Sequence, residues 1–337
     1  MTTYGIKALR QIQMSRESAI GTSTTDYKVW RGTGMLADMR VVEFPQEDIG
    51  ILGGADRTYI PKKSGELNME AVPATFEQLG YIFDAGFYEA TPTTDGSGYV
   101  RTWTLPIAST STKSSSDLQT YAFKGGDNAD VEYMKGAFVK SLTLSGAAGE
   151  AFNITATWEG KEVASDSDGF ETATTPTVEE ILFGKAKLYI DESTGTFGAT
   201  QVSNVFLSMD LPITTGWMSL FTGDGSVEFT DLKQTQPEIT LNVTFEHSTS
   251  AIAEKAAFRA QTPRLVRIIA EGSALSVAGS TYTYKTLILD LAGKWESFEA
   301  IGEQDGDDIV VGTLRCRYNA TAAKYFEAKL VNEVAAL

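Results

Sequence analysis

The chain has 337 residues, 42% hydrophobic and 21% charged, the composition of an ordinary globular protein rather than a disordered one. Its formal net charge is −16, and a surface this acidic argues against tight wrapping of nucleic acid through phosphate contacts. No segment has the apolar length of a signal peptide or membrane span, so the chain is expected to act where it is made, or in an assembly built there.

The first half of the sequence predicts a strand, loop-rich strands, a strand leading into a helix, and then three or four more strands. The helix is expected within residues 73–86, where Thr75 and Gln78 form a capping-box pattern before an apolar stripe. Gly86 can end it, because glycine tolerates the backbone conformation at helix C-termini.

A long loop before this helix, residues 44–61, is unusually rich in large apolar side chains. They are Ile49, Ile51, Leu52, Tyr59 and Ile60. Such a loop either folds onto its own core or is buried by another subunit.

Residues 138–161 are the clearest β-hairpin, with apolar and polar residues alternating on both sides of a Gly/Ala tip. The hairpin carries no histidine, cysteine or paired carboxylates. A polar segment with Pro176, residues 164–180, then predicts a domain boundary.

The remaining sequence resembles the first part in the same order. The matched positions are Glu17 with Glu192, Leu67 with Leu241, residues 99–103 with 265–269, residues 120–124 with 281–285, Phe138 with Phe298, and Trp158 with Tyr318. The offset between matches falls along the chain, which is explained by extra residues in two Thr/Ser/Gly-rich stretches, 90–98 and 108–117. A duplicated domain is the economical interpretation.

The second repeat also has its helix and its apolar loop. The helix is expected in residues 248–261, opened by Ser/Thr and stopped before Pro263. The loop, residues 211–225, carries Trp217, Met218, Leu220 and Phe221. Because both repeats place an apolar loop at the same point, a shared interface role is favoured over folding onto the core.

Catalytic and ligand-binding motifs do not emerge from the sequence. The one histidine, His247, has no second histidine or spare cysteine as a partner, and the one cysteine, Cys316, alternates with apolar neighbours as a buried residue does. No nucleotide-binding glycine motif, nucleophile elbow or EF-hand spacing occurs. We therefore expect no enzymatic activity, no metal and no cofactor.

These patterns predict a mainly β fold with one helix per domain, arranged as two tandem β-sandwich or barrel-type domains. The first domain is expected at residues 1–165 and the second at 181–337, joined by a linker at 166–180.

The order of strand, long loop, strand, helix and hairpin resembles the major tail tube proteins of long-tailed bacteriophages. The hairpin at 138–161 and the stretch 17–43 carry the likeness, and some tube proteins fuse two tube domains in one chain. The resemblance implies a structural virion protein whose domains close six to a ring, so that a two-domain chain forms homotrimeric rings with pseudo-sixfold symmetry.

The same resemblance implies that rings stack through the long loops, here residues 44–62 and 211–236, into a tube. The nine apolar loop residues would then make inter-ring or inter-subunit contacts. The tube would form around a tape-measure protein in the host cytoplasm, contact tail terminator and baseplate proteins, and in the virion pass genomic DNA through its lumen without specific binding.

Two other classes stay open at the level of sequence. One is another self-assembling β-rich virion component, such as a decoration or baseplate protein. The other is a carbohydrate-binding or hydrolytic β-sandwich. Arg315 and Arg317, which share the polar face of the second hairpin, do not suit a DNA-lined lumen unless acids or another subunit pair with them.

Overall fold

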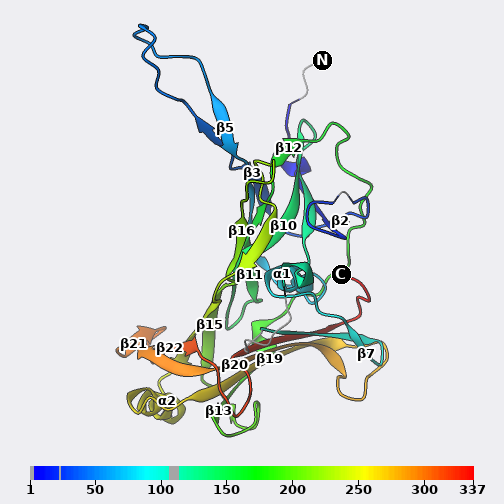
Figure 1. Cartoon of the computed structure of the whole chain (residues 1–337). Helices are drawn as coiled ribbons and strands as arrows, with labels where there is room; N and C mark the ends of the chain where they lie inside the picture. The colour runs from blue at the N-terminus through cyan, green and yellow to red at the C-terminus, as the bar shows by residue number, and fades with distance from the viewer. Residues whose placement is uncertain (1–3, 23, 106–113) are drawn as a thin grey trace.

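A computed structural model describes residues 4–22, 24–105 and 114–337; part of the Thr/Ser-rich stretch 108–117 therefore lies outside the described residues. Of the described residues, 50% are in strands and 9% in helices, which confirms the mainly β prediction. Two α-helices accompany the strands within the described ranges, and neither is long and apolar enough to cross a membrane. The molecule is elongated, and one hairpin projects far from the body (Figure 1).

Strands in the first half, up to residue 165, enclose the helix α1 (Leu79–Gly86). They are β1 (Gln11–Arg16), β2 (Lys28–Val29), β3 (Gly34–Asp38), β4 (Val41–Glu43), β5 (Tyr59–Lys62), β6 (Gly65–Pro73), β7 (Thr93–Asp95), β8 (Gly98–Thr104), β9 (Tyr121–Gly126), β10 (Val131–Ala147), β11 (Asn153–Gly160) and β12 (Val163–Ser165). Short 3₁₀ turns lie at Lys7–Leu9 and Ser115–Asp117.

The second half, from residue 181, contains the helix α2 (Thr249–Arg259) and a 3₁₀ turn at Phe183–Lys185. Its strands are β13 (Ala186–Glu192), β14 (Gln201–Val202), β15 (Phe206–Thr214), β16 (Trp217–Leu220), β17 (Asp231–Gln234), β18 (Glu238–Glu246), β19 (Arg264–Ala274), β20 (Tyr284–Phe298), β21 (Gly302–Gln304), β22 (Asp307–Cys316) and β23 (Phe326–Asn332).

Four strands from each half join into one antiparallel sheet. Among the described residues its order is β3-β6-β11-β10-β15-β18-β22-β20, and the pairing of β10 with β15 joins the halves. The order repeats, because β3, β6, β11 and β10 occupy the places that β15, β18, β22 and β20 occupy in the second half. We refer to this as the continuous sheet.

The long strands β10 and β20 each belong to two sheets. The first part of β10 lies in the order β2-β1-β9-β10-β12, and the first part of β20 in the order β14-β13-β19-β20-β23-β8-β7. A β-bulge leaves one residue unpaired in each long strand, Lys140 and Glu296. Such bulges bend a strand, which suits a strand that passes from one sheet to the other.

The register of the two halves confirms one sequence match and corrects another. Leu67 stands opposite Trp158, and Leu241 opposite Leu314. Leu67 and Leu241 therefore correspond, as predicted, but Trp158 corresponds to Leu314 rather than to Tyr318. The sequence alignment of the hairpins was four residues out of register. An even shift leaves the alternation of inward and outward side chains unchanged, so the alternation could not reveal it.

Two further sequence matches are wrong for a topological reason. Residues 99–103 lie in β8, which pairs with β23 of the second half, whereas residues 265–269 lie in β19, between β13 and β20. The strand in the place of β19 in the first half is β9, between β1 and β10. The predicted match of residues 120–124, in β9, with 281–285 therefore also fails. The hairpin β7–β8 is an addition that extends the second half's sheet.

Helix α2 begins and ends near its predicted positions, and α1 ends at Gly86 as predicted, but α1 begins at Leu79, later than the predicted cap at Thr75, because residues 76–78 form a turn. Thr75 Oγ1 accepts a hydrogen bond from the backbone N–H of Gln78 at 3.3 Å, which is half of the predicted capping box; the Gln78 side chain instead donates to Val29 O at 3.1 Å. Ser248 caps α2 by accepting from the Ala251 N–H. Helix α1 is buried on all sides, and α2 only on the side of Trp295, whose indole N–H donates to Glu254 at 2.8 Å.

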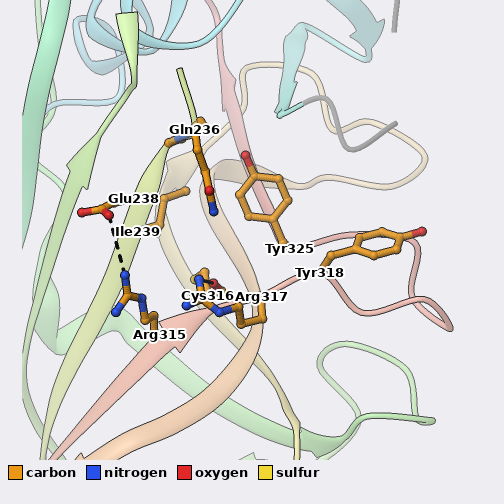
Figure 2. A pocket seen from close by; sticks show the side chains of 9 residues that line it. Gln236, Glu238, Ile239, Arg315, Cys316, Arg317, Tyr318 and Tyr325 are labelled. Carbon is orange, nitrogen blue, oxygen red and sulfur yellow. Dashed lines mark hydrogen bonds and ion pairs between the residues drawn. The ribbon is translucent and has the colours of Figure 1, made fainter. Parts of the chain in front are cut away.

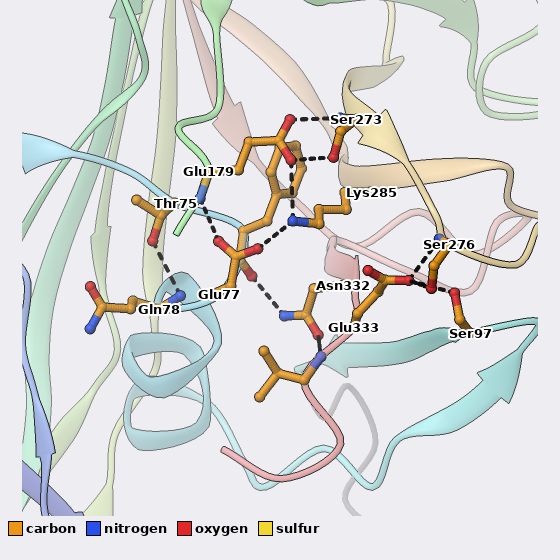
Figure 3. Close-up of polar contacts among 12 residues, drawn as sticks. Thr75, Glu77, Gln78, Ser97, Glu179, Ser273, Ser276, Lys285, Asn332 and Glu333 are labelled. Atoms are coloured by element: carbon orange, nitrogen blue, oxygen red, sulfur yellow. Dashed lines mark hydrogen bonds and ion pairs between the residues drawn. The ribbon is translucent and has the colours of Figure 1, made fainter. Parts of the chain in front are cut away.

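Polar contacts tie the two halves together (Figure 3). Lys285 Nζ lies 2.7 Å from Glu77 and 3.2 Å from Glu179, at the end of the predicted linker. Asn332 donates to Phe76 O at 2.7 Å. Glu333 accepts hydrogen bonds from Ser276 and Ser97, which lower its pKa to about 2. The halves therefore share a fixed interface within one chain.

Candidate assembly interface

The continuous sheet ends in two unpaired edges. Within the described part of the chain, β3 pairs with β6 alone, and residues 294–298 of β20 pair with β22 alone. An unpaired strand edge presents free N–H and C=O groups that template pairing with another chain. Met35 on β3 and Ile301 just beyond β20 are 61% and 51% exposed, which is high for large apolar side chains.

The junction of β10 with β15 shows what covers such an edge inside the chain. Seven consecutive residue pairs run from Ser141 opposite Thr214 to Ala147 opposite Ser208. Leu142 stands opposite Ile213, and both are buried. In the first half β10 occupies the place that β20 occupies in the second half, and β15 occupies in the second half the place of β3. The free edges of β20 and β3 are therefore equivalent to the two strands that pair at this junction, but each of them lacks a partner strand.

One face of the continuous sheet is buried and the other is polar. The half-exposed residues between the buried ones on β10, β11, β15 and β18 are mostly Ser, Thr and Asn. Hydrogen bonds repeat on this face: Thr157 donates to Asn68 at 3.1 Å, and Thr313 donates to Asn242 at 2.9 Å. These two pairs occupy matching places in the halves, so the polar face is a repeated surface.

The first apolar loop forms the projecting hairpin of β4 and β5, residues 41–62 (Figure 1). An ion pair of Arg57 with Glu47 at 2.6 Å bridges it. Of the predicted contact residues, Ile49, Ile51, Leu52 and Tyr59 are exposed and Ile60 is partly exposed. Phe44, which the prediction omitted, is exposed as well. The hairpin therefore presents an apolar surface without a core of its own.

The second apolar loop instead folds back on the first half. Trp217 is 3% exposed, and its indole N–H donates to Phe87 O at 3.3 Å. Its ring stacks edge-on against Tyr88, and a small apolar cluster encloses it. The cluster consists of Tyr88, Leu118, Phe138, Trp217, Phe229 and Leu232, with Phe221 packed against it.

Trp217 was expected to contact another subunit or ring, but residues of its own chain that are distant in sequence already bury it. Leu220 and Phe221 are partly exposed, and Met218 is exposed. The loop's neighbours across the halves could not be found from local sequence. We call the hairpin β16–β17 with its connecting residues, 217–234, the seated hairpin.

Possible catalytic and metal-binding groups lie apart from one another. Among the described residues, no cluster of three or more His, Cys, Asp or Glu could hold a metal ion. His247 is partly exposed, and its backbone N–H donates to Asp308 O at 2.8 Å. Burial raises the pKa of the Cys316 thiol, which disfavours the reactive thiolate.

A pocket of about 330 Å³ lies where β18 begins and β22 ends (Figure 2). It is lined by Gln236, Pro237, Glu238, Ile239, Arg315, Cys316, Arg317, Tyr318 and Tyr325. Arg315 is partly exposed and lies 3.6 Å from Glu238 and 3.4 Å from Glu296. The neighbouring acids anticipated for this arginine are therefore present.

Open sheet edges, a projecting apolar hairpin and a repeated polar face are the features expected of a structural protein. A profile of the phage tail tube protein family matches residues 8–318, so the chain belongs to that family. It is a structural virion protein of the phage tail, and the family assembles into a tube. A search of curated proteins found no match.

Proposed function

We propose that the chain closes into rings by pairing the β20 edge of one copy with the β3 edge of the next. The observation that carries the proposal is the junction of β10 with β15, which joins equivalent strands within the chain. Transferred to the free edges, its register places Glu299 opposite Ala37, since they correspond to Thr143 and Pro212. The exposed apolar side chains of Met35 and Ile301 would then lie close to each other along the joined edges.

Ring closure follows from the head-to-tail nature of this contact. One edge meets a different edge, so the contact repeats until a rotation closes it. With two equivalent sheet segments per chain, three chains give a ring with pseudo-sixfold symmetry, and closure leaves no edge of the continuous sheet exposed. The repeated strand order supports an internal duplication into domains 1–165 and 181–337 with a linker at 166–180.

Rings would stack through the projecting hairpin. Ile49, Ile51 and Leu52 are exposed in the segment between β4 and β5, and Tyr59 is exposed nearer the base. The tip of this hairpin projects away from the body of the molecule and needs a different partner surface (Figure 1). A neighbouring ring supplies one in a stacked tube. Ile60, Met218, Leu220 and Phe221 lie in the two hairpins and add contacts at ring surfaces, while Trp217 anchors the seated hairpin from within.

The polar face of the continuous sheet would line the lumen through which DNA leaves the virion for the host cell. Hydroxyl and amide side chains hydrated by water give a passing duplex no strong attachment. Because DNA carries about one negative charge per 1.7 Å, a cationic wall would hold it, and this chain has a net charge of −16. We expect the tube to assemble in the host cytoplasm around a tape-measure protein, and to contact tail terminator and baseplate proteins.

Negative-stain electron microscopy of the concentrated protein tests the function. We expect hollow tubes or discrete rings with threefold or pseudo-sixfold symmetry. Monomers at every concentration, checked by sedimentation velocity, would contradict the proposal.

A further inference from the structure

The internal junction of the two halves continues beyond the pairing of β10 with β15. Residues 181–183, which lead into β13, run along the turn between β10 and β11. The Phe152 N–H donates to Ile181 O at 2.7 Å, and the Phe183 N–H donates to Glu150 O at 3.0 Å. The ring centres of Phe152 and Phe183 lie 5.2 Å apart, and both rings are buried. The start of the second half is therefore bound to the hairpin turn of the first half.

A matching segment lies at the start of the first half. A 3₁₀ turn at Lys7–Leu9 precedes β1, as the turn at Phe183–Lys185 precedes β13. Lys7 therefore has the place of Phe183, and residues 5–7 have that of residues 181–183.

The sheet register gives the same correspondence. Ala137 on β10 and Gly293 on β20 match, because each lies three residues before the bulge of its strand. Counting outwards through the neighbouring strand leads from Ala137 to Arg16 on β1, and from Gly293 to Glu192 on β13. Arg16 and Glu192 each lie nine residues after the start of the preceding 3₁₀ turn. The match of Glu17 with Glu192 suggested by the sequence is therefore one residue out.

The hairpin turn of the second half matches that of the first. From the register of β11 and β22, Asp308 has the place of Phe152. A shared hydrogen bond supports the count, because Phe152 O accepts from the Ala74 N–H at 2.7 Å and Asp308 O from the His247 N–H at 2.8 Å. Ala74 and His247 each directly precede the residue that caps the following helix. Residues 306–308 therefore correspond to the turn that residues 181–183 cover.

Both counterparts are uncovered. Residues 4–10 and residues 301–308 are exposed throughout, whereas Phe152 and Phe183 are buried. Lys7 lines a surface pocket beside the free edge of β3, and β21 lies at the opposite end of the molecule (Figure 1). The two segments can therefore meet only between copies.

Charge complementarity supports such a contact. In the places of the two packed rings of Phe183 and Phe152 stand Lys7 and Asp308, which carry opposite charges. Neither forms an ion pair with any residue that the structure describes. Each side chain would thus gain its ionic partner from the other copy.

The segment before β1 is already held by its own half. The Ile6 N–H donates to Asn128 Oδ1 at 2.9 Å, and Asn128 Nδ2 donates to Tyr4 O at 3.0 Å. At the internal junction, the hydrogen bonds to the turn come from the residues on either side of Leu182, which has the place of Ile6. The neighbours of Ile6 can therefore bond to a turn while Ile6 keeps its bond to Asn128.

We propose that residues 5–7 of one copy lie along the turn 306–308 of the adjacent copy in the ring, with Lys7 paired to Asp308. The Lys7 N–H and the Gly5 C=O bond to the backbone of that turn. The inference rests on the proposed ring, because pairing of β20 with β3 brings these segments together as pairing of β10 with β15 does their internal counterparts.

Charge reversal tests the contact. In Lys7→Glu and in Asp308→Lys, like charges meet at every junction, and we expect the concentration needed for assembly to rise by at least about tenfold. The double variant Lys7→Glu/Asp308→Lys restores opposite charges and should assemble near the wild-type concentration. Arg259→Glu, an exposed change on α2 of the same sign as Lys7→Glu, is the matched control and should assemble normally.

Sedimentation velocity and negative-stain microscopy over a concentration series give the readout, with circular dichroism to check folding. Wild-type assembly of both single variants, or a folded double variant as defective as the single ones, would overturn the pairing of Lys7 with Asp308 while leaving the ring intact. Failure of the wild-type chain to assemble would overturn the ring itself, and this inference with it.

Discussion

Asp84 gives the subunit a pH dependence that the structure allows us to work out. The carboxyl group lies at the end of α1 and is 1% exposed. Its Oδ1 accepts hydrogen bonds from the Trp103 indole at 2.8 Å and from the Ala90 N–H at 3.1 Å. Burial, opposed in part by these hydrogen bonds, raises its pKa from 3.8 to about 6.

A raised carboxyl pKa means that the folded state holds the proton more tightly than the unfolded chain. The contribution of protonated Asp84 to the free energy of unfolding is therefore present below pH 4 and is lost as the pH rises through 6. A shift of about two units corresponds to about 3 kcal/mol, of which about 2 kcal/mol is lost between pH 4 and pH 7.

Asp84→Asn removes this titration, and its Oδ1 can still accept from Trp103 and Ala90. We expect the free energy of unfolding of Asp84→Asn, relative to wild type, to increase by about 2 kcal/mol from pH 4 to pH 7. Urea unfolding of dilute subunit, followed by tryptophan fluorescence at several pH values, measures it. A difference that stays constant over this range would refute the reasoning.

Asp95 provides the control. Backbone hydrogen bonds from Tyr282 and Thr281, with those from Ser280, lower its pKa to about 2. The stability it contributes is lost only as the pH falls below 4. Asp95→Asn should therefore differ from wild type by the same amount at pH 4 and pH 7.

Three further substitutions test individual surfaces. Trp217→Ala should lower the free energy of unfolding by about 3–5 kcal/mol in urea titrations, because it empties a buried site, whereas Met218→Ala should change it little. Ile51→Asp should leave folding intact and leave rings unstacked in electron micrographs; normal tubes would contradict the stacking role. Lys124→Met should speed proteolysis within residues 166–180, since Lys124 lies 2.8 Å from Asp166 in that linker, and unchanged cleavage would count against this anchor.

Local sequence was enough to predict the helices and the alternating strands. The N-cap Ser248, Gly86 at the end of α1, and the in-out pattern of β10 and β11 are each determined by near neighbours. Leu67 and Leu241 match because their strands have the same partners in both halves.

Contacts between distant segments were not predictable from the same patterns. The sequence alignment matched Trp158 with Tyr318 instead of Leu314, an error of four residues. It arose because alternation repeats every two residues, so a shift of four leaves the pattern unchanged. The pairing of β8 with β23 and the burial of Trp217 beside Tyr88 depend on segments far apart in sequence. A residue-type pattern records that a side chain is apolar, but not whether its own chain or another copy covers it.

Cysteine cross-linking across the proposed ring junction tests the central claim most directly. Directly opposite residues in antiparallel strands have Cβ atoms about 4.5–5.5 Å apart, which a disulfide or a short thiol cross-linker can span. In Ala37→Cys/Glu299→Cys we expect covalent dimers and trimers on a denaturing gel, with the trimer as the largest closed product. Asp38→Cys/Glu299→Cys places the first thiol on the other face and should not cross-link. Absence of cross-linking in assembled Ala37→Cys/Glu299→Cys, or equal cross-linking of both variants, would contradict the proposed ring junction.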